Sequence, residues 1–165
     1  MGWGSNCYGQ LGDSTNGSWS NFRTIPFQIS GLNGIIAIAA GGTHSLALKN
    51  DGTVWAWGHS TYGAIGNGTF GGPPYSIPFP IQIPGLTGIT GIGAGTSYSV
   101  ALKNDSTVWG WGLNHYGQIG VPDLLSIRPT PAQIGGLTGI TAIAAGWEHT
   151  LALKSNGRVM ALGHN

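Results

Sequence analysis

Hydrophobic residues along this chain lie in short runs separated by turn residues, a pattern typical of strands. Three apolar runs bounded by glycine, at Ile35–Ala40, Ile89–Ala94 and Ile140–Ala145, predict buried strands. Each run ends in small side chains, as expected where strands converge on an axis and space is short. No stretch shows helical periodicity over ten residues, so we expect almost no helix.

One longer segment carries most of this pattern and occurs three times, at residues 39–58, 93–112 and 144–163. In the first copy, predicted strands over His44–Lys49 and Val54–Trp57 flank an Asn-Asp-Gly turn. Glycine supplies the positive φ that such a hairpin turn needs. Each copy therefore predicts a strand followed by a tight hairpin.

A proline-flanked strand completes each unit, at Pro26–Ile29, Pro80–Ile83 and Pro131–Ile134. Proline at the start of a strand fits an outer edge, where a missing N–H costs little. We therefore expect four-stranded sheets, each with this strand at its outer edge.

The units are evenly spaced. Trp3 lies 54 residues before Trp57, Trp57 lies 54 before Trp111, and Trp111 lies 51 before Leu162. A period near fifty residues indicates a repeat architecture. The chain is one domain of three repeats, at about 3–56, 57–110 and 111–161.

Several short motifs recur in the same order in these copies. A small-residue run precedes His44 and His149, followed by Leu-Ala-Leu-Lys, the Asn-Asp-Gly turn and Trp-Gly. A Tyr-Gly element lies downstream, at Tyr8, Tyr62 and Tyr116. This unit resembles the RCC1 repeat, the blade of RCC1-type β-propellers, over essentially the whole chain. The resemblance implies an all-β propeller of four-stranded blades.

Departures from the repeat pattern are few. Tyr98 stands where the other copies have histidine, and Ala64 replaces glutamine. Met160 and Leu162 replace both tryptophans of the third copy.

Composition narrows the classes of function. The net charge of +1 has no basic run behind it, which argues against nucleic-acid binding. The single cysteine, Cys7, excludes an intrachain disulfide, and we recognise neither a signal peptide nor a membrane segment. Only 7% of residues are charged and 31 are glycine, a composition that resembles bacterial secreted or cell-surface propellers.

The titratable residues do not gather into a reactive group. His44 and His149 share one repeat position and would be spread around a ring, so we expect hydrogen bonds within their own blades. Asp51 and Asp105 belong to turns, and no carboxylate pair stands out for acid–base work. We therefore predict no enzyme activity, no metal and no cofactor.

The loops at 13–23, 67–75 and 121–128 do not follow the repeat pattern and differ in sequence from one copy to the next. Large apolar anchors on loops of a rigid scaffold are a common means of binding partners, although such side chains also cover outer strands. Glu148 beside Trp147 interrupts a position that is Thr or Ser in the other copies, although a solvated acid at a strand end has the same pattern. The candidate partner-binding residues are Trp19, Phe22, Phe70, Tyr75, Leu124, Trp147 and Glu148.

We expect a non-enzymatic binding or scaffold module that acts through loops on a propeller face. The resemblance leaves an alternative, a fragment of a longer RCC1-like protein such as a GTPase regulator or an enzyme inhibitor. A second alternative is a small-ligand binder or enzyme that uses the central channel, although the Ile, Ala and Gly expected to line it carry little chemistry.

Three blades are too few for a ring, because propellers typically close with about four to eight blades. Residues 1–6 and 160–165 duplicate one strand segment, so the C-terminus begins a blade and the N-terminus ends one. Joining two chains head to tail would close six blades, so the chain is expected to be its own partner, as a homodimer. A lone chain would expose apolar blade faces at its ends, and each junction between chains would displace one duplicated strand.

Overall fold

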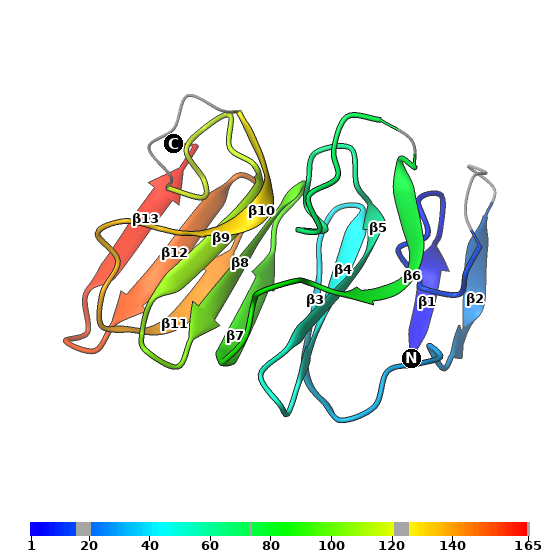
Figure 1. Cartoon of the computed structure of the whole chain (residues 1–165), viewed down its shortest axis with the longest axis horizontal. Helices are drawn as coiled ribbons and strands as arrows, with labels where there is room; N and C mark the ends of the chain where they lie inside the picture. Colours follow the sequence, from blue (N-terminus) through cyan, green and yellow to red (C-terminus); the bar gives the residue numbers. More distant parts are fainter. Residues whose placement is uncertain (16–20, 73, 121–125, 165) are drawn as a thin grey trace.

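The computed structural model describes residues 1–15, 21–72, 74–120 and 126–164, and it is all-β, with no helix among these residues (Figure 1). It contains thirteen strands within the described residues. They are β1 Gly2–Ser5, β2 Phe22–Phe27, β3 Ile35–Ala40, β4 His44–Lys49, β5 Val54–His59, β6 Ser76–Gln82, β7 Ile89–Ala94, β8 Tyr98–Lys103, β9 Val108–Leu113, β10 Ile127–Gln133, β11 Ile140–Ala145, β12 His149–Lys154 and β13 Val159–Gly163.

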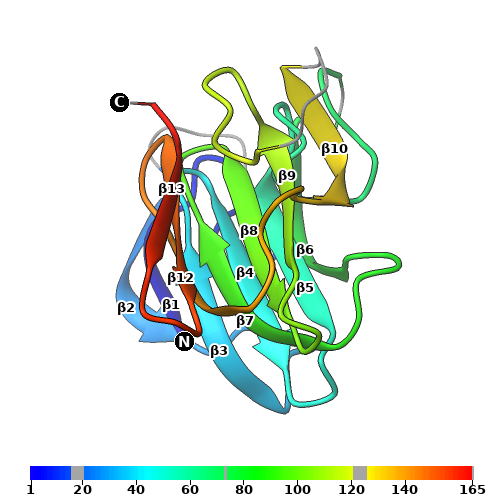
Figure 2. The ribbon, with the colours of Figure 1, turned by 90° about the vertical axis from the view of Figure 1, so that its left-hand side faces the viewer.

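The strands form four antiparallel sheets, which we call blades 1 to 4. Blades 2 and 3 are complete, with strand orders β3-β4-β5-β6 and β7-β8-β9-β10. Among the described residues, blade 1 contains only β1 and β2, and blade 4 contains only β11, β12 and β13. The four sheets stand side by side with their faces toward one another (Figures 1 and 2). The predicted four-stranded blade is therefore confirmed.

The predicted first and second strands match the structure, but the prediction for the outer strand was wrong at its start. β6 begins at Ser76 and β10 at Ile127, so their prolines lie inside the strand rather than at its beginning. The outer strand has a free edge, which tolerates a missing N–H. The register of pairing also shifts within these strands, between Ala56 and Gly58 where β5 pairs with β6, and between Arg128 and Ala132 where β10 pairs with β9.

Neighbouring blades pack by setting large side chains of one face against the next sheet. In the core between blades 2 and 3, Leu46 and Leu48 of β4 cluster with Ala101 of β8 and Trp111 of β9. Val100 and Leu102 of blade 3 make the corresponding cluster with blade 4. Each such interface buries the apolar face that a single sheet would leave in water.

The two ends of the row lack that cover. Ile38 of β3 is 77% exposed, because blade 1 has no strands to place over it. Leu151 and Leu153 of β12 are also exposed, whereas their equivalents Leu46 and Leu48 are fully buried. The predicted apolar end faces are present.

Both duplicated end segments are paired in the single chain. β1 pairs with β2, and β13 pairs with β12. The displacement of one duplicated strand, expected at a junction between chains, stays a prediction.

A repeated hydrogen-bond pattern fixes each blade to the one before it. The Gln10 carbonyl of blade 1 accepts from Ser45 Oγ and Trp57 Nε1 of blade 2, both at 2.8 Å. The Ala64 carbonyl of blade 2 accepts from Ser99 Oγ at 3.0 Å and Trp111 Nε1 at 2.8 Å. These carbonyls belong to the Tyr-Gly elements, so one motif serves every junction.

The last junction has only half of this pattern. The Gln118 carbonyl accepts from Thr150 Oγ1 at 2.8 Å, and Leu162 stands where the tryptophans would donate. Blade 4 is therefore attached by one of these two bonds.

Replacing Trp111 with Phe should lower the free energy of unfolding by about 1–2 kcal/mol, because it removes a buried hydrogen bond. Trp55→Phe is the matched control, since Trp55 Nε1 has no hydrogen-bond partner among the described residues. Urea denaturation followed by circular dichroism measures both variants. Equal losses in the two variants would contradict the role given to the indole bond.

Candidate functional site

The loops of the blades divide between two ends. Those that follow β1, β3, β5, β7, β9 and β11 lie at the top in Figure 1, and we call this the upper end. The turns within the Asn-Asp-Gly hairpins and the connections between blades lie at the lower end. The upper end therefore collects the segments in which the three repeats differ most.

Five of the candidate partner-binding residues are in the described part of the chain, and all five lie at the upper end. Phe22 is 62% exposed, Phe70 53%, Tyr75 57% and Trp147 83%. Glu148 is half-buried. Phe70 and Tyr75 share one loop, whereas Phe22 and Trp147 belong to other blades. Trp19 and Leu124 lie outside the described residues.

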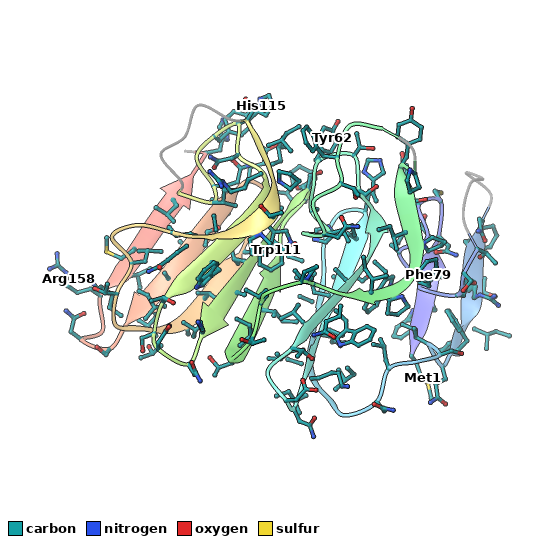
Figure 3. All side chains as sticks on the ribbon, in the orientation of Figure 1. Met1, Tyr62, Phe79, Trp111, His115 and Arg158 are labelled. Carbon is teal, nitrogen blue, oxygen red and sulfur yellow. The ribbon has the colours of Figure 1, made fainter. Side chains whose placement is uncertain are left out.

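A row of tyrosine and histidine rings at the upper end escaped the sequence analysis. Tyr8 of blade 1 lies 4.4 Å from His59 of blade 2, between ring centroids, and His59 lies 5.9 Å from Tyr62. Tyr116 of blade 3 and His164 of blade 4 repeat the contact between Tyr8 and His59, with 4.5 Å between their ring centroids. Figure 3 labels Tyr62 and His115 at this end. The sequence carries part of this signal, because the tyrosine recurs in each repeat, whereas the position of His59 and His164 is Leu113 in the copy between them.

His59 lies inside this row, where its ring is half-buried. Burial lowers the pKa of its imidazole below the usual value. Thr61 Oγ1 lies 3.0 Å from His59 Nε2. His59 is therefore a neutral, hydrogen-bonded part of the surface at neutral pH.

His44 bridges two blades, which corrects the prediction of a hydrogen bond within its own blade. Its Nε2 lies 2.9 Å from Ser99 Oγ, which in turn donates to the Ala64 carbonyl. Since the serine proton is used there, His44 must donate from Nε2. Nδ1 is then a buried lone pair that has no hydrogen-bond partner among the residues that the structure describes. The repeat period places a residue in its blade but does not show which blade it contacts.

The same repeat position in the next blade holds Tyr98, and it also reaches forward. Tyr98 OH donates to the carbonyl of His149 and lies 3.2 Å from that of Gly146. A Cβ placed on Gly41, Gly95 or Gly146 would lie within 2.4 Å of the ring three residues later. This contact explains the small residues before each ring.

Asp13 holds the base of the first variable loop. Asn6 Nδ2 donates to its carboxylate at 2.8 Å, and Arg23 forms an ion pair with it at 2.7 Å. Burial alone would raise the pKa of this carboxyl, but hydrogen bonds from Thr15, Arg23 and Asn6 outweigh it and lower the pKa to about 2. Asp13 is thus an ionised residue whose hydrogen bonds and ion pair hold Asn6, Thr15 and Arg23 together.

In the part of the chain that the structure describes, no three His, Cys, Asp or Glu side chains are placed to hold a metal ion. No helix in that part is long and apolar enough to cross a membrane.

The family model described as "Regulator of chromosome condensation (RCC1) repeat" matches residues 2–48, 51–102 and 105–153, and a second model of the same description matches 35–64 and 89–118. The chain belongs to the RCC1-repeat family. The resemblance inferred from the motifs is confirmed.

Relatives of this RCC1-repeat chain have varied roles. The ultraviolet-B receptor UVR8 of Arabidopsis thaliana is 29% identical over 167 residues, covering 98% of this chain and 36% of UVR8. The human E3 ubiquitin-protein ligase HERC2 is 33% identical over 171 residues, covering 99% of this chain but 3% of HERC2.

Solved structures agree on the fold. Yeast RCC1 (Prp20), solved bound to Kap60, has a TM-score of 0.82 at 24% identity, covering 98% of this chain and 38% of Prp20. Human WBSCR16 has a TM-score of 0.77 at 22% identity, covering 97% and 41%. The RCC1-repeat chain thus spans about two fifths of these propeller chains, and 36% of UVR8.

Acid should destabilise the chain through His44. Burial, followed by the nearby charge of His59, lowers the pKa of His44 from 6.5 to about 4 in the folded chain. The unfolded chain therefore binds the proton more readily. The stability that His44 contributes is complete above pH 6.5 and is lost as pH falls to about 4, amounting to about 3 kcal/mol.

Urea denaturation between pH 7 and pH 4 measures this loss. His44→Gln should flatten the pH dependence in that window, whereas His149→Gln, at the same repeat position but exposed, should leave the parent slope. An unchanged slope in His44→Gln would show that other groups govern the acid response.

Proposed function

We propose that this RCC1-repeat chain is a non-enzymatic binding and scaffold module whose upper-end loops contact a protein partner. The observation that carries the proposal is the exposure of Phe70, Tyr75 and Trp147 on loops of one end of a stack of sheets. Aromatic side chains held in place by a rigid scaffold are the usual anchors of protein interfaces.

The relatives support the class of function. Yeast Prp20 was solved with Kap60, and the same protein was examined for its binding to Gsp1p and histones. UVR8 is a receptor. These names support protein binding through the repeat and leave the identity of the partner open. A secreted or cell-surface location also stays a prediction.

Phe70→Ser with Tyr75→Ser should weaken partner binding at least tenfold, which is the loss of about 1.4 kcal/mol, because two anchor side chains are removed. Phe79→Ser is the matched control. Phe79 is 50% exposed, close to the 53% of Phe70, but it lies on the outer strand β6 rather than in the loop (Figure 3).

The measurement starts with the tagged chain and an extract of its native host. Proteins retained by the parent and by Phe79→Ser, but not by the double variant, are then purified and titrated by calorimetry. Equal affinity of the parent and the double variant for the purified partner would overturn the loop proposal.

The second part of the proposal is that two chains assemble head to tail into a six-bladed ring. It is supported by the exposed apolar faces of β3 and β12, and by the strands of blades 1 and 4, because β11 and β12 of one chain with β1 and β2 of the other make one complete four-stranded blade. If that blade is shared, each chain adds three blades. Two chains are then the number that falls within the usual four to eight.

Native mass spectrometry should therefore give twice the 17.0 kDa of one chain. A monomeric mass together with cooperative unfolding would overturn self-assembly. That outcome would favour the alternative, a segment of a longer RCC1-like protein, which the partial coverage of UVR8 and Prp20 also fits.

A further inference from the structure

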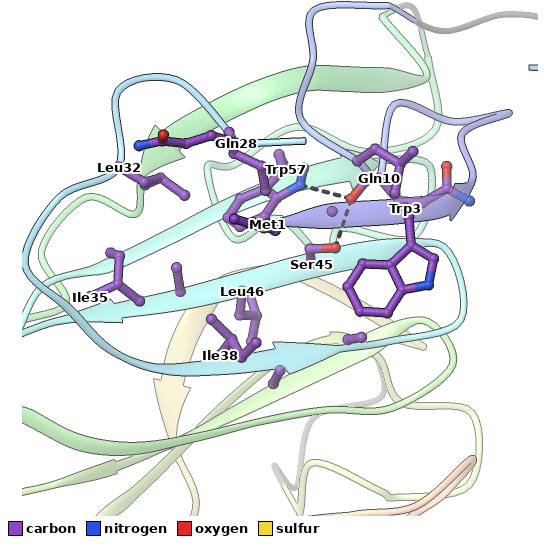
Figure 4. A pocket seen from close by; sticks show the side chains of 16 residues that line it. Met1, Trp3, Gln10, Gln28, Leu32, Ile35, Ile38, Ser45, Leu46 and Trp57 are labelled. Atoms are coloured by element: carbon purple, nitrogen blue, oxygen red, sulfur yellow. Dashed lines mark hydrogen bonds between the residues drawn. The ribbon is translucent and has the colours of Figure 1, made fainter. Parts of the chain in front are cut away.

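A groove lies beside β1, where the two complete blades have a strand. Its volume is about 610 Å³, and its lining includes Trp3, Leu32, Ile38, Leu46 and Trp57 (Figure 4). In blades 2 and 3, the strand that pairs with the inner side of β5 or β9 is β4 or β8. The groove is therefore the vacant position of the second strand of blade 1.

Trp3 shows what this vacancy leaves uncovered. Trp3, Trp57 and Trp111 share one repeat position, and Trp57 and Trp111 are 3% and 0% exposed. Trp3 is 61% exposed. Its position thus belongs to the buried face of a complete blade, but the strands that would bury it are absent.

Gly4 marks the same vacancy in the backbone. Its φ of 104° matches the 108° of Gly58 and the 100° of Gly112. A Cβ on Gly58 or Gly112 would lie 2.6 Å from the backbone oxygen of Thr43 or Ser97, just before the second strand of the blade. A Cβ on Gly4 would meet nothing within 4 Å. β1 therefore keeps the backbone shape of a strand with a neighbour, without having that neighbour.

β12 has the chemistry that the vacant position requires. Its Leu151 and Leu153 correspond to Leu46 and Leu48, which are buried against blade 3 with Ala101 and the partly buried Ile92. Beside β1, the same leucines would meet Ile38 and Ala47 of blade 2. This contact would cover both exposed ends of the chain at once.

Two strands compete for the place next to β12 when copies join. β13 holds it in the isolated chain, with Leu162 opposite Thr150. β1 would place Trp3 there, and its indole would supply the donor that the Gln118 carbonyl lacks from Leu162. Val159 of β13 has no counterpart in β1, but its side chain is 63% exposed, so the exchange removes little apolar burial there.

The attachment of each strand decides the competition. β13 pairs with β12 and β1 pairs with β2, but β1 also leads into the Gln10 carbonyl that accepts from Ser45 and Trp57. Removing β1 would disturb the two hydrogen bonds that join blades 1 and 2, whereas removing β13 loses the ring contact of His164 with Tyr116 and the packing of Leu162 against blade 3. The hydrogen bonds that β13 loses to β12 are replaced by those of β1, so the apolar burial at the junction is the net gain.

From this we infer that, in the head-to-tail assembly proposed above, β1 of one copy displaces β13 of a second copy and pairs with that copy's β12. The occupant of the groove is thus the β11–β12 hairpin of a second copy. The inference rests on the proposed self-assembly, and it adds the register and the strand that leaves.

The register is fixed by a bond that recurs three times. The amides of His59, Leu113 and His164 donate to the carbonyls of Thr43, Ser97 and Glu148, each at 2.9 Å. Ser5 holds the position of His59 in β1. In the exchanged blade, Ser5 of one copy therefore lies opposite Glu148 of the second copy.

Paired cysteines report which strand is present. In a Cys7→Ser background, Ser5→Cys with Glu148→Cys should form a covalent dimer on mild oxidation, since opposing strand positions meet the distance that a disulfide needs. Glu148→Cys with His164→Cys is the matched control. It should give little intrachain disulfide in the assembled protein, because β13 has left. Non-reducing electrophoresis and peptide mass spectrometry measure both.

A tryptophan exchange tests the same point without cysteine. Trp3→Leu with Leu162→Trp gives β13 the indole and removes it from β1, so the dissociation constant of the dimer should rise at least tenfold. Phe79→Leu, which removes an exposed aromatic ring from the outer strand β6 of a complete blade, should leave it within twofold. Analytical ultracentrifugation measures all three proteins.

The outcomes separate the inference from the self-assembly on which it rests. A native dimer that forms the 148–164 disulfide but not the 5–148 disulfide, or that is strengthened by the tryptophan exchange, overturns the displacement of β13 and leaves self-assembly intact. A parent chain that stays monomeric overturns both.

Discussion

The structure depends on one backbone carbonyl per repeat, in the Tyr-Gly element that follows the third strand. At Gln10 and Ala64 this oxygen accepts two hydrogen bonds from the next blade, one from a serine and one from an indole. These bonds lie between sheets that otherwise meet through hydrophobic contacts, and hydrophobic contacts have no preferred direction. They therefore set the register between neighbouring blades, which hydrophobic contact alone leaves loose.

The same carbonyl lies at the base of the upper-end loops, so blade stacking and surface presentation are coupled. The element that supplies Gln10 continues into Asp13, whose carboxylate is fixed by Asn6 and Arg23. The tyrosine of the element contacts the histidine of the next blade. Loops that differ in sequence thus start from equivalent, hydrogen-bonded positions. A scaffold of repeated blades can in this way carry a surface that is specific to this chain.

Much of the fold follows from local patterns in the sequence. The strands that begin at Ile35 and His44 were predicted at their observed bounds, because glycines limit one and a tight turn limits the other. The start of β6 was missed, because proline was taken to mark the beginning of the strand, whereas an outer strand tolerates proline within it. Contacts between blades were harder to predict: the partner of His44 is Ser99, 55 positions later, and a repeat period says which residues are equivalent rather than which ones touch.

The offset between repeat and blade has an evolutionary consequence. Each sequence repeat supplies the last two strands of one blade and the first two of the next, so every repeat boundary lies inside a sheet. A gene duplication that adds one repeat creates the same junction that is already there, without a new kind of surface. Propellers of different size can therefore arise by copying a single coding unit.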